Sequence, residues 1–82
     1  MERPKRSKRH RAPNTALIEL RINEGLTPAD LAYRCGTSAK TIRLAEAGFT
    51  PGPRIQFEIA KVFGVRPLEI WPLERQKVAA LR

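Results

Sequence analysis

Apolar residues recur at helical spacing in five segments of the chain, and capping or turn residues separate these segments. The segment from Thr27 to Gly36, one of two central segments, has a complete set of helix start and stop signals. Thr27 is a good N-cap residue, Pro28 suits the first helical position, and Asp30 completes a capping box. Because glycine readily takes the left-handed conformation of a helix end, we predict a helix that begins at Pro28 and stops at Gly36.

The next central segment is a helix with one apolar side and one exposed side. Ser38 is its N-cap, Gly48 ends it, and Ile42 and Ala45 share the inward side. The opposite side carries a predicted exposed stripe of Ala39, Lys40, Arg43, Leu44 and Ala47. Small residues and two cations on an exposed helix suit the major groove of DNA, where cations reach guanine O6 and N7.

Three further helices complete the pattern. The first is expected from Thr15 to Glu24 after an N-cap at Asn14, the fourth from about Arg54 to Phe63, and a short fifth from Pro67 to Trp71. The residues expected in the core include Leu17, Leu20, Ile42, Ala45, Ile55 and Ile59. With helical spacing in all five segments, the sequence predicts an all-α domain, and its 82 residues suffice for one small core.

Positive charge is concentrated before the first helix. The net charge is +8, and residues 1–13 contribute +5 of it, from six cations and one acid. The six cations are Arg3, Lys5, Arg6, Lys8, Arg9 and Arg11. This segment has no apolar periodicity, so we expect a disordered basic arm, either a solvated tail or a contact to a polyanion. Beside a helix of the kind described above, DNA is the favoured partner.

The chain offers little for catalysis or metal binding. Cys35 and His10 are its single cysteine and histidine, which excludes an internal disulfide and a zinc site built from His and Cys. Cys35 is expected to be a small buried hydrophobe, and no nucleophile has a base beside it, so neither an enzyme nor a cofactor is predicted. No apolar run reaches the roughly 20 residues of a membrane helix, and no secretory signal is present. We therefore expect a cytoplasmic protein.

The two central helices resemble the helix-turn-helix of the lambda-repressor-like family, which includes Cro and the xenobiotic-response-element-type regulators. The resemblance rests on the run LTPADLA from Leu26, on CGTS, on TI, and on Glu46 and Gly48. It continues with Ile59-Ala60-Lys61 and Phe63-Gly64-Val65, so that it covers the chain from about Leu17 to Ile70. The ending Ile70-Trp71-Pro72 is similar to that of the Ner-like phage regulators.

The resemblance implies a compact five-helix fold and assigns roles to particular residues. It implies an ion pair between Arg21 on the first helix and Glu46 on the third. It also implies that Arg54 touches the DNA backbone or minor groove, although an ordinary surface arginine is an equal alternative. The family usually has Gln at the position of Pro28, where it contacts a phosphate, and this chain lacks that contact.

From these features we predict a sequence-specific transcriptional regulator that binds double-stranded DNA. The resemblance implies a Cro-like or repressor-like protein of phage or prophage type. We expect it in the cytoplasm of a bacterium or of a phage-infected host. Residues 1–13 are the arm, 14–72 the DNA-binding domain, and 73–82 a C-terminal helical tail. Lys40 and Arg43 are predicted to contact bases, and Ala39 and Leu44 to contact thymine methyl groups. Phosphate contacts are assigned to the arm and to Ser38, Thr41 and Arg54.

Two other functions fit the same features. The protein could be the DNA-binding antitoxin of a toxin–antitoxin pair, with the tail bound to a protein partner. It could also be an architectural or recombination accessory protein that binds DNA mainly through charge. A homodimer, formed in solution or only on DNA, is a further expectation. Its contact would come from the tail or from Trp71, although Trp71 is favoured as a plug of the core.

Overall fold

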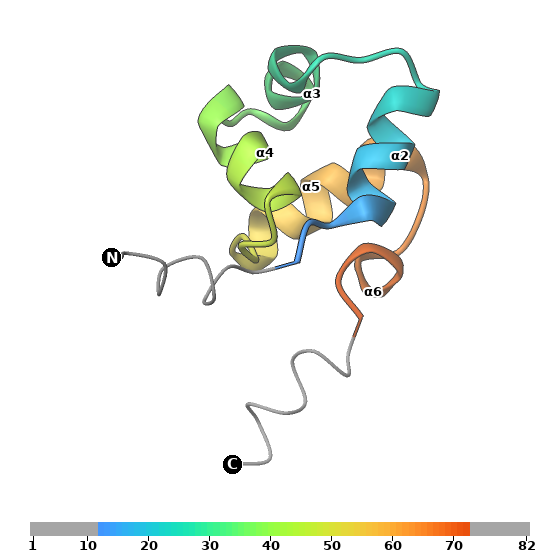
Figure 1. Ribbon diagram of the computed structural model, residues 1–82. Coiled ribbons are helices and arrows are strands. Elements are labelled where there is room, and N and C mark those ends of the chain that lie inside the picture. The colour runs from blue at the N-terminus through green and yellow to red at the C-terminus, as the bar shows by residue number, and fades with distance from the viewer. Residues whose placement is uncertain (1–11, 73–82) are drawn as a thin grey trace, which may run out of the picture.

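The computed structural model describes residues 12–72 of the chain. Within this range the chain forms helices and no strand, which confirms the all-α prediction (Figure 1). The five helices are α2 (Thr15–Asn23), α3 (Pro28–Cys35), α4 (Ala39–Glu46), α5 (Pro53–Phe63) and α6 (Pro67–Ile70). They end within two residues of the predicted bounds: α2 stops one residue before Glu24, α6 one residue before Trp71, and α4 two residues before Gly48. The predicted tail and nearly all of the predicted arm lie outside the described residues.

Local signals set the beginning and end of α3. The Asp30 backbone N–H donates to Thr27 Oγ1 at 3.0 Å, and the Thr27 N–H donates to the Asp30 carboxylate at 2.9 Å. The predicted capping box is therefore confirmed, and these two bonds hold the pKa of the Asp30 carboxyl below its ordinary value. Gly36 follows with a φ of 71°, a left-handed conformation that favours glycine.

The core lies where the helices converge. The largest fully buried side chains come from every helix and from the residue that follows α6, and they are Leu17, Leu31, Ile42, Ile59, Ile70 and Trp71. Trp71 is only 2% exposed, so it plugs the core as favoured from the sequence and cannot serve as a dimer contact. Cys35 is buried too, which raises the pKa of its thiol and confirms it as a small hydrophobe.

Asn14 joins three helices through its backbone and side chain. Its Oδ1 accepts the Leu17 N–H at 3.1 Å, which makes it the N-cap of α2, as predicted. Its Nδ2 donates to the Ile70 carbonyl at 3.1 Å, and its own backbone N–H donates to the Glu46 carbonyl at 2.9 Å. Asn14 therefore holds the start of α2 against the C-terminal ends of α4 and α6.

Candidate nucleic-acid interface

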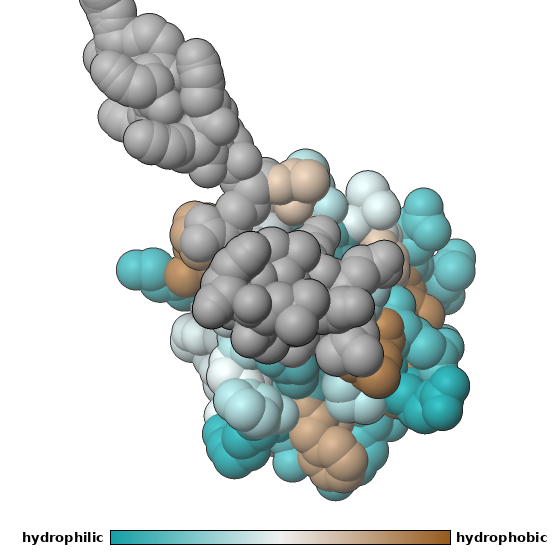
Figure 2. Space-filling model, turned by 90° about the horizontal axis from the view of Figure 1, so that it is seen from below, coloured by the Kyte–Doolittle hydropathy of each residue, from teal (hydrophilic) through white to brown (hydrophobic). Residues whose placement is uncertain are grey.

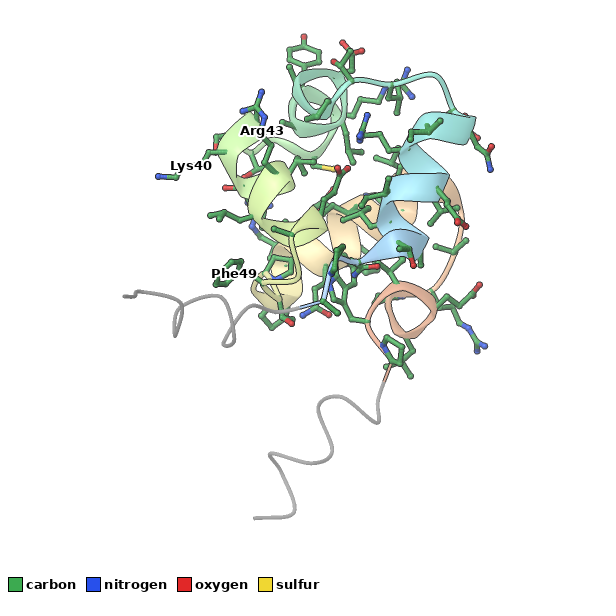
Figure 3. All side chains as sticks on the ribbon, viewed as in Figure 1. Lys40, Arg43 and Phe49 are labelled. Carbon is green, nitrogen blue, oxygen red and sulfur yellow. The ribbon has the colours of Figure 1, made fainter. Side chains whose placement is uncertain are left out.

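Helix α4 presents a polar side to solvent and packs its apolar side inward. Ile42 and Ala45 are buried, and α4 packs mainly on α3. Lys40, Arg43 and Leu44 are exposed, as is Ala47. Lys40 and Arg43 project outward from the side of the molecule opposite α2 (Figure 3). The predicted exposed stripe is correct for these four residues, whereas Ala39 at its start is only half-exposed.

The cations of the described residues divide into paired and unpaired groups. Three of them lie within 4.0 Å of a carboxylate, in the pairs Arg21–Glu46, Lys61–Glu58 and Arg66–Glu69. The other four, among residues 12–72, form no such ion pair, and they are Arg34, Lys40, Arg43 and Arg54. All four belong to α3, α4 or the start of α5, so positive charge that no ion pair neutralises is concentrated around the helix pair α3–α4.

The Arg21–Glu46 ion pair, predicted through the family resemblance, is formed. Arg21 Nε and Nη2 donate to the two Glu46 carboxylate oxygens at 2.5 and 3.2 Å, and Nη1 donates to the Leu26 carbonyl at 2.8 Å. Both side chains are largely buried, with 15% and 12% of their surface exposed. The hydrogen bond to Glu46 raises the pKa of Arg21. Glu46 is the single acid of α4, and the Arg21 guanidinium neutralises its charge. The paired carboxylate therefore repels a polyanion less than an unpaired carboxylate would.

Hydroxyl groups surround the N-terminus of α4. Ser38 Oγ accepts the Thr41 backbone N–H at 3.2 Å, and the two hydroxyl oxygens of Ser38 and Thr41 lie 3.0 Å apart. Ser38 is exposed, Thr41 is half-exposed, and the unpaired Lys40 stands between them in the sequence. Hydroxyls and a cation at the positive end of a helix dipole are groups that bind phosphate oxygens.

A second helix N-terminus, that of α5, has no side-chain cap. Gly52 precedes α5 and provides no side-chain cap, and Arg54 in the first turn is exposed. The turn before α5 is braced by Gln56, whose Nε2 donates to the Pro51 carbonyl at 2.8 Å. This bond gives the half-buried Gln56 amide a partner. The first-turn N–H groups of α5 and the Arg54 guanidinium are thus positioned to bind an anion.

Phe49 is an exposed residue that the sequence analysis treated only as part of a turn. Its backbone N–H donates to the Leu44 carbonyl at 3.0 Å, and the side chains of Phe49 and Leu44 are 46% and 42% exposed. Phe49 projects from the same side of the molecule as Lys40 (Figure 3). An aromatic residue directly after the glycine that ends the helix was the available signal. Leu44 and Phe49 therefore form an apolar edge at the C-terminal end of α4.

The basic arm emerges at this same end of α4. Ala12 and Pro13 are exposed, and the next residue, Asn14, is hydrogen-bonded to Glu46. The six predicted arm contacts, from Arg3 to Arg11, lie outside the described residues, but the point from which the arm leaves the domain is fixed. The segment that precedes Asn14 therefore begins beside the C-terminal end of α4.

Other kinds of site have no counterpart in residues 12–72. No group of His, Cys, Asp or Glu in this range could hold a metal ion. None of the helices in this part of the chain is long and apolar enough to cross a membrane. Comparison with protein-family models, curated proteins and solved structures found no match to the chain.

Proposed function

We propose that this protein is a sequence-specific transcriptional regulator that binds double-stranded DNA, with α4 as its recognition helix. The observation that carries the proposal is the outward face of α4, where Lys40 and Arg43 are exposed and form no ion pair within the described residues. A helix that reads DNA needs cations that are available for phosphates and bases, and these two side chains meet that requirement.

The arrangement of the helices supports a lambda-repressor-like fold as part of the proposal. The joint Gly36–Ser38 between α3 and α4 is short, and the two helices pack closely. The pair formed by Arg21 and Glu46 is the one expected from the resemblance. In such a domain α3 crosses the DNA backbone while α4 enters the major groove. A Cro-like or repressor-like role of phage or prophage type, in the cytoplasm, belongs to the same proposal.

Base recognition is assigned to the exposed side of α4. Lys40 and Arg43 would donate to guanine O6 and N7, a contact worth about 1–3 kcal/mol of discrimination per base. Leu44, with Ala39 nearer the N-terminus, would contact thymine methyl groups. Phe49, which lies beside Leu44, extends this apolar edge toward the sugar-phosphate backbone.

Phosphate contacts position the domain on the duplex. Ser38 and Thr41 would hold one phosphate at the N-terminus of α4, and Arg54 with the open first turn of α5 would hold another. The arm would run along the duplex from its fixed origin near Glu46 and add affinity through its six cations. These contacts require neither a cofactor nor a catalytic group.

The decisive experiment is a selection of bound sequences from a pool of random double-stranded DNA. The full-length protein should enrich a short motif, and the double variant Lys40→Ala/Arg43→Ala should fail to enrich it. The matched control is Lys61→Ala, because Lys61 stands on α5 and faces Glu58 and the Phe57 ring. Enrichment of no motif would reject sequence-specific regulation.

The same selection tests the second candidate, an architectural DNA-binding protein. The concentration of +5 of the +8 net charge in residues 1–13 favours it, because an arm of this kind binds DNA of any sequence. Strong binding to the whole pool without a motif, reduced mainly by deletion of the arm, would establish this alternative.

A further inference from the structure

An open groove lies between α2 and α6, and it is distinct from the proposed DNA-binding face. It has a volume of about 250 Å³ and is lined by Ala16, Glu19, Leu20, Asn23, Val65 and Glu69. The four α2 residues are spaced i, i+3, i+4 and i+7, so they form one stripe along that helix. Leu17 and Arg21, which pack toward the core and α4, belong to a different side of α2.

The groove has an apolar floor and an acidic rim. Leu20 and Val65 are half-buried and pack against the core, and Ala16 continues the floor toward the start of α2. Glu19 forms no ion pair within residues 12–72. The Glu69 carboxylate accepts the Arg66 backbone N–H at 3.1 Å and lies 3.6 Å from Arg66 Nε in an exposed ion pair, so Glu19 is the main source of unpaired negative charge at the rim. The groove is smaller than typical small-molecule pockets, which measure about 300–1,000 Å³, and its size suits a few side chains of a peptide. Its apolar floor favours apolar side chains, and its acidic rim favours basic ones.

The chain itself contains a segment of this composition. Residues 73–82 follow the described part and combine apolar Leu73, Val78 and Leu81 with basic Arg75, Lys77 and Arg82. The segment starts three residues after Ile70, whose carbonyl accepts a hydrogen bond from Asn14 at the start of α2. The described chain therefore ends at the edge of the domain that carries the groove. A surface that carries both halves of a contact is self-complementary, which is what a twofold dimer requires.

We propose that residues 73–82 of one copy occupy the α2–α6 groove of a second copy, and that the exchange is reciprocal. The apolar side chains of the segment cover Leu20 and Val65, while its cations face Glu19 and Glu69. Each dimer contains this contact twice. The contact does not depend on the proposed DNA binding, but it would supply the two recognition helices that a dyad-symmetric DNA site needs.

The test measures the monomer–dimer equilibrium in the absence of DNA, by sedimentation equilibrium over micromolar to millimolar protein. The full-length chain should dimerise, and the chain truncated after Pro72 should remain monomeric. Glu19→Lys should weaken the dimer about tenfold, because the charge change acts in both contacts. The control Glu24→Lys changes another exposed acid, the C-cap residue of α2, which lies outside the groove, and should leave the equilibrium unchanged. Thermal unfolding of each variant verifies that the fold is retained.

A charge exchange makes the assignment specific. Adding Lys77→Glu to Glu19→Lys should restore part of the lost dimer affinity, whereas Lys77→Glu alone should weaken the dimer. A full-length protein that stays monomeric, or a truncated one that still dimerises, would overturn the proposal. Nuclear magnetic resonance gives a further test at concentrations where the protein is a monomer. If truncation of residues 73–82 changed the Leu20 and Val65 signals under these conditions, the proposal would also be overturned. That result would place the segment in the groove of its own chain.

Discussion

The backbone N–H of Asn14 donates to the carbonyl oxygen of Glu46 at 2.9 Å, which fixes the start of α2 at the C-terminal end of α4. This bond connects the two parts of the chain to which DNA binding is assigned. The basic arm precedes Asn14 directly, and Glu46 is the last residue of the proposed recognition helix. The arm consequently begins beside α4, at the edge where Leu44 and Phe49 are exposed.

The first prediction concerns the arm. Each phosphate neutralised contributes about 0.9 to the slope of log affinity against log salt concentration. If about half of the six arm cations engage the duplex, deletion of residues 1–12 should reduce the slope by about 3. The preferred sequence should stay the same, because base recognition is assigned to α4. Affinities of the full-length and shortened proteins across a salt series give this slope, and an unchanged value would make the arm a solvated tail.

The second prediction separates base contacts from phosphate contacts on α4. Lys40→Ala and Arg43→Ala should each reduce the binding free energy for the preferred site by about 1–3 kcal/mol, with a much smaller effect on unrelated DNA. Arg54→Ala should weaken binding to all sequences alike, because Arg54 is assigned to a phosphate. Titrations of each variant with both duplexes measure the difference. Equal losses on both duplexes for Lys40→Ala and Arg43→Ala would reassign these side chains to the backbone.

The third prediction concerns the brace between α2 and α4. Arg21→Met leaves the largely buried Glu46 carboxylate and the Leu26 carbonyl without their donor, so it should lower the free energy of unfolding by about 2–3 kcal/mol. Arg21→Met/Glu46→Leu should recover part of this loss, since it removes the unpaired charge. Urea denaturation measures both effects.

The Lys61–Glu58 pair provides the matched control for this brace. Its Lys61 side chain is 61% exposed and its N–O distance is 3.8 Å, so Glu58→Gln should change stability by less than about 0.5 kcal/mol. If Arg21→Met were as mild as Glu58→Gln, the Arg21–Glu46 pair would have no structural role.

The fourth prediction divides the roles of Asn14. Asn14→Ala removes the N-cap of α2 and the bond to Ile70, and should lower the free energy of unfolding by about 2–3 kcal/mol. Asn14→Ser keeps a capping oxygen but cannot reach the Ile70 carbonyl, so its effect should be intermediate. Thr15→Ala, at the exposed neighbouring position, serves as the control in the same denaturation experiment. Equal losses for the Ala and Ser variants would mean that the bond to Ile70 accounts for the whole effect.

The fifth prediction is a pH dependence that arises from the capping box. The lowered pKa of Asp30 means that its capping bonds stabilise the fold fully above the pKa of an unfolded-chain Asp, about 3.9. This stabilisation is lost as the pH falls through the lower folded-state pKa. Between about pH 5 and pH 2, the melting temperature should therefore fall less for Asp30→Asn than for the unaltered protein. Parallel curves for the two proteins would show that Asp30 does not contribute to acid unfolding.

The sequence by itself determined the features that depend on neighbours along the chain. Helix caps form between residues three or four positions apart, so the helix bounds could be predicted from spacing alone. The caps concerned are Thr27 with Asp30, Ser38, and the glycines at the helix ends. Helical periodicity likewise identified the buried side of α4, at Ile42 and Ala45, and hence its exposed side. The pair between Arg21 and Glu46 came from the family resemblance, since no local pattern connects residues 25 positions apart.

The tertiary structure decided the features that depend on which helix ends meet. Asn14 looked like an ordinary N-cap, and only the packing of α4 and α6 against α2 gives its remaining polar groups their partners, Glu46 and Ile70. The brace between Gln56 and Pro51 requires the turn to fold back onto α5. The groove between α2 and α6 arises in the same way, because a helix stripe becomes a groove only when a second helix supplies the opposite wall. Buried polar groups and surface hollows are set by contacts between distant segments, which a local pattern does not contain.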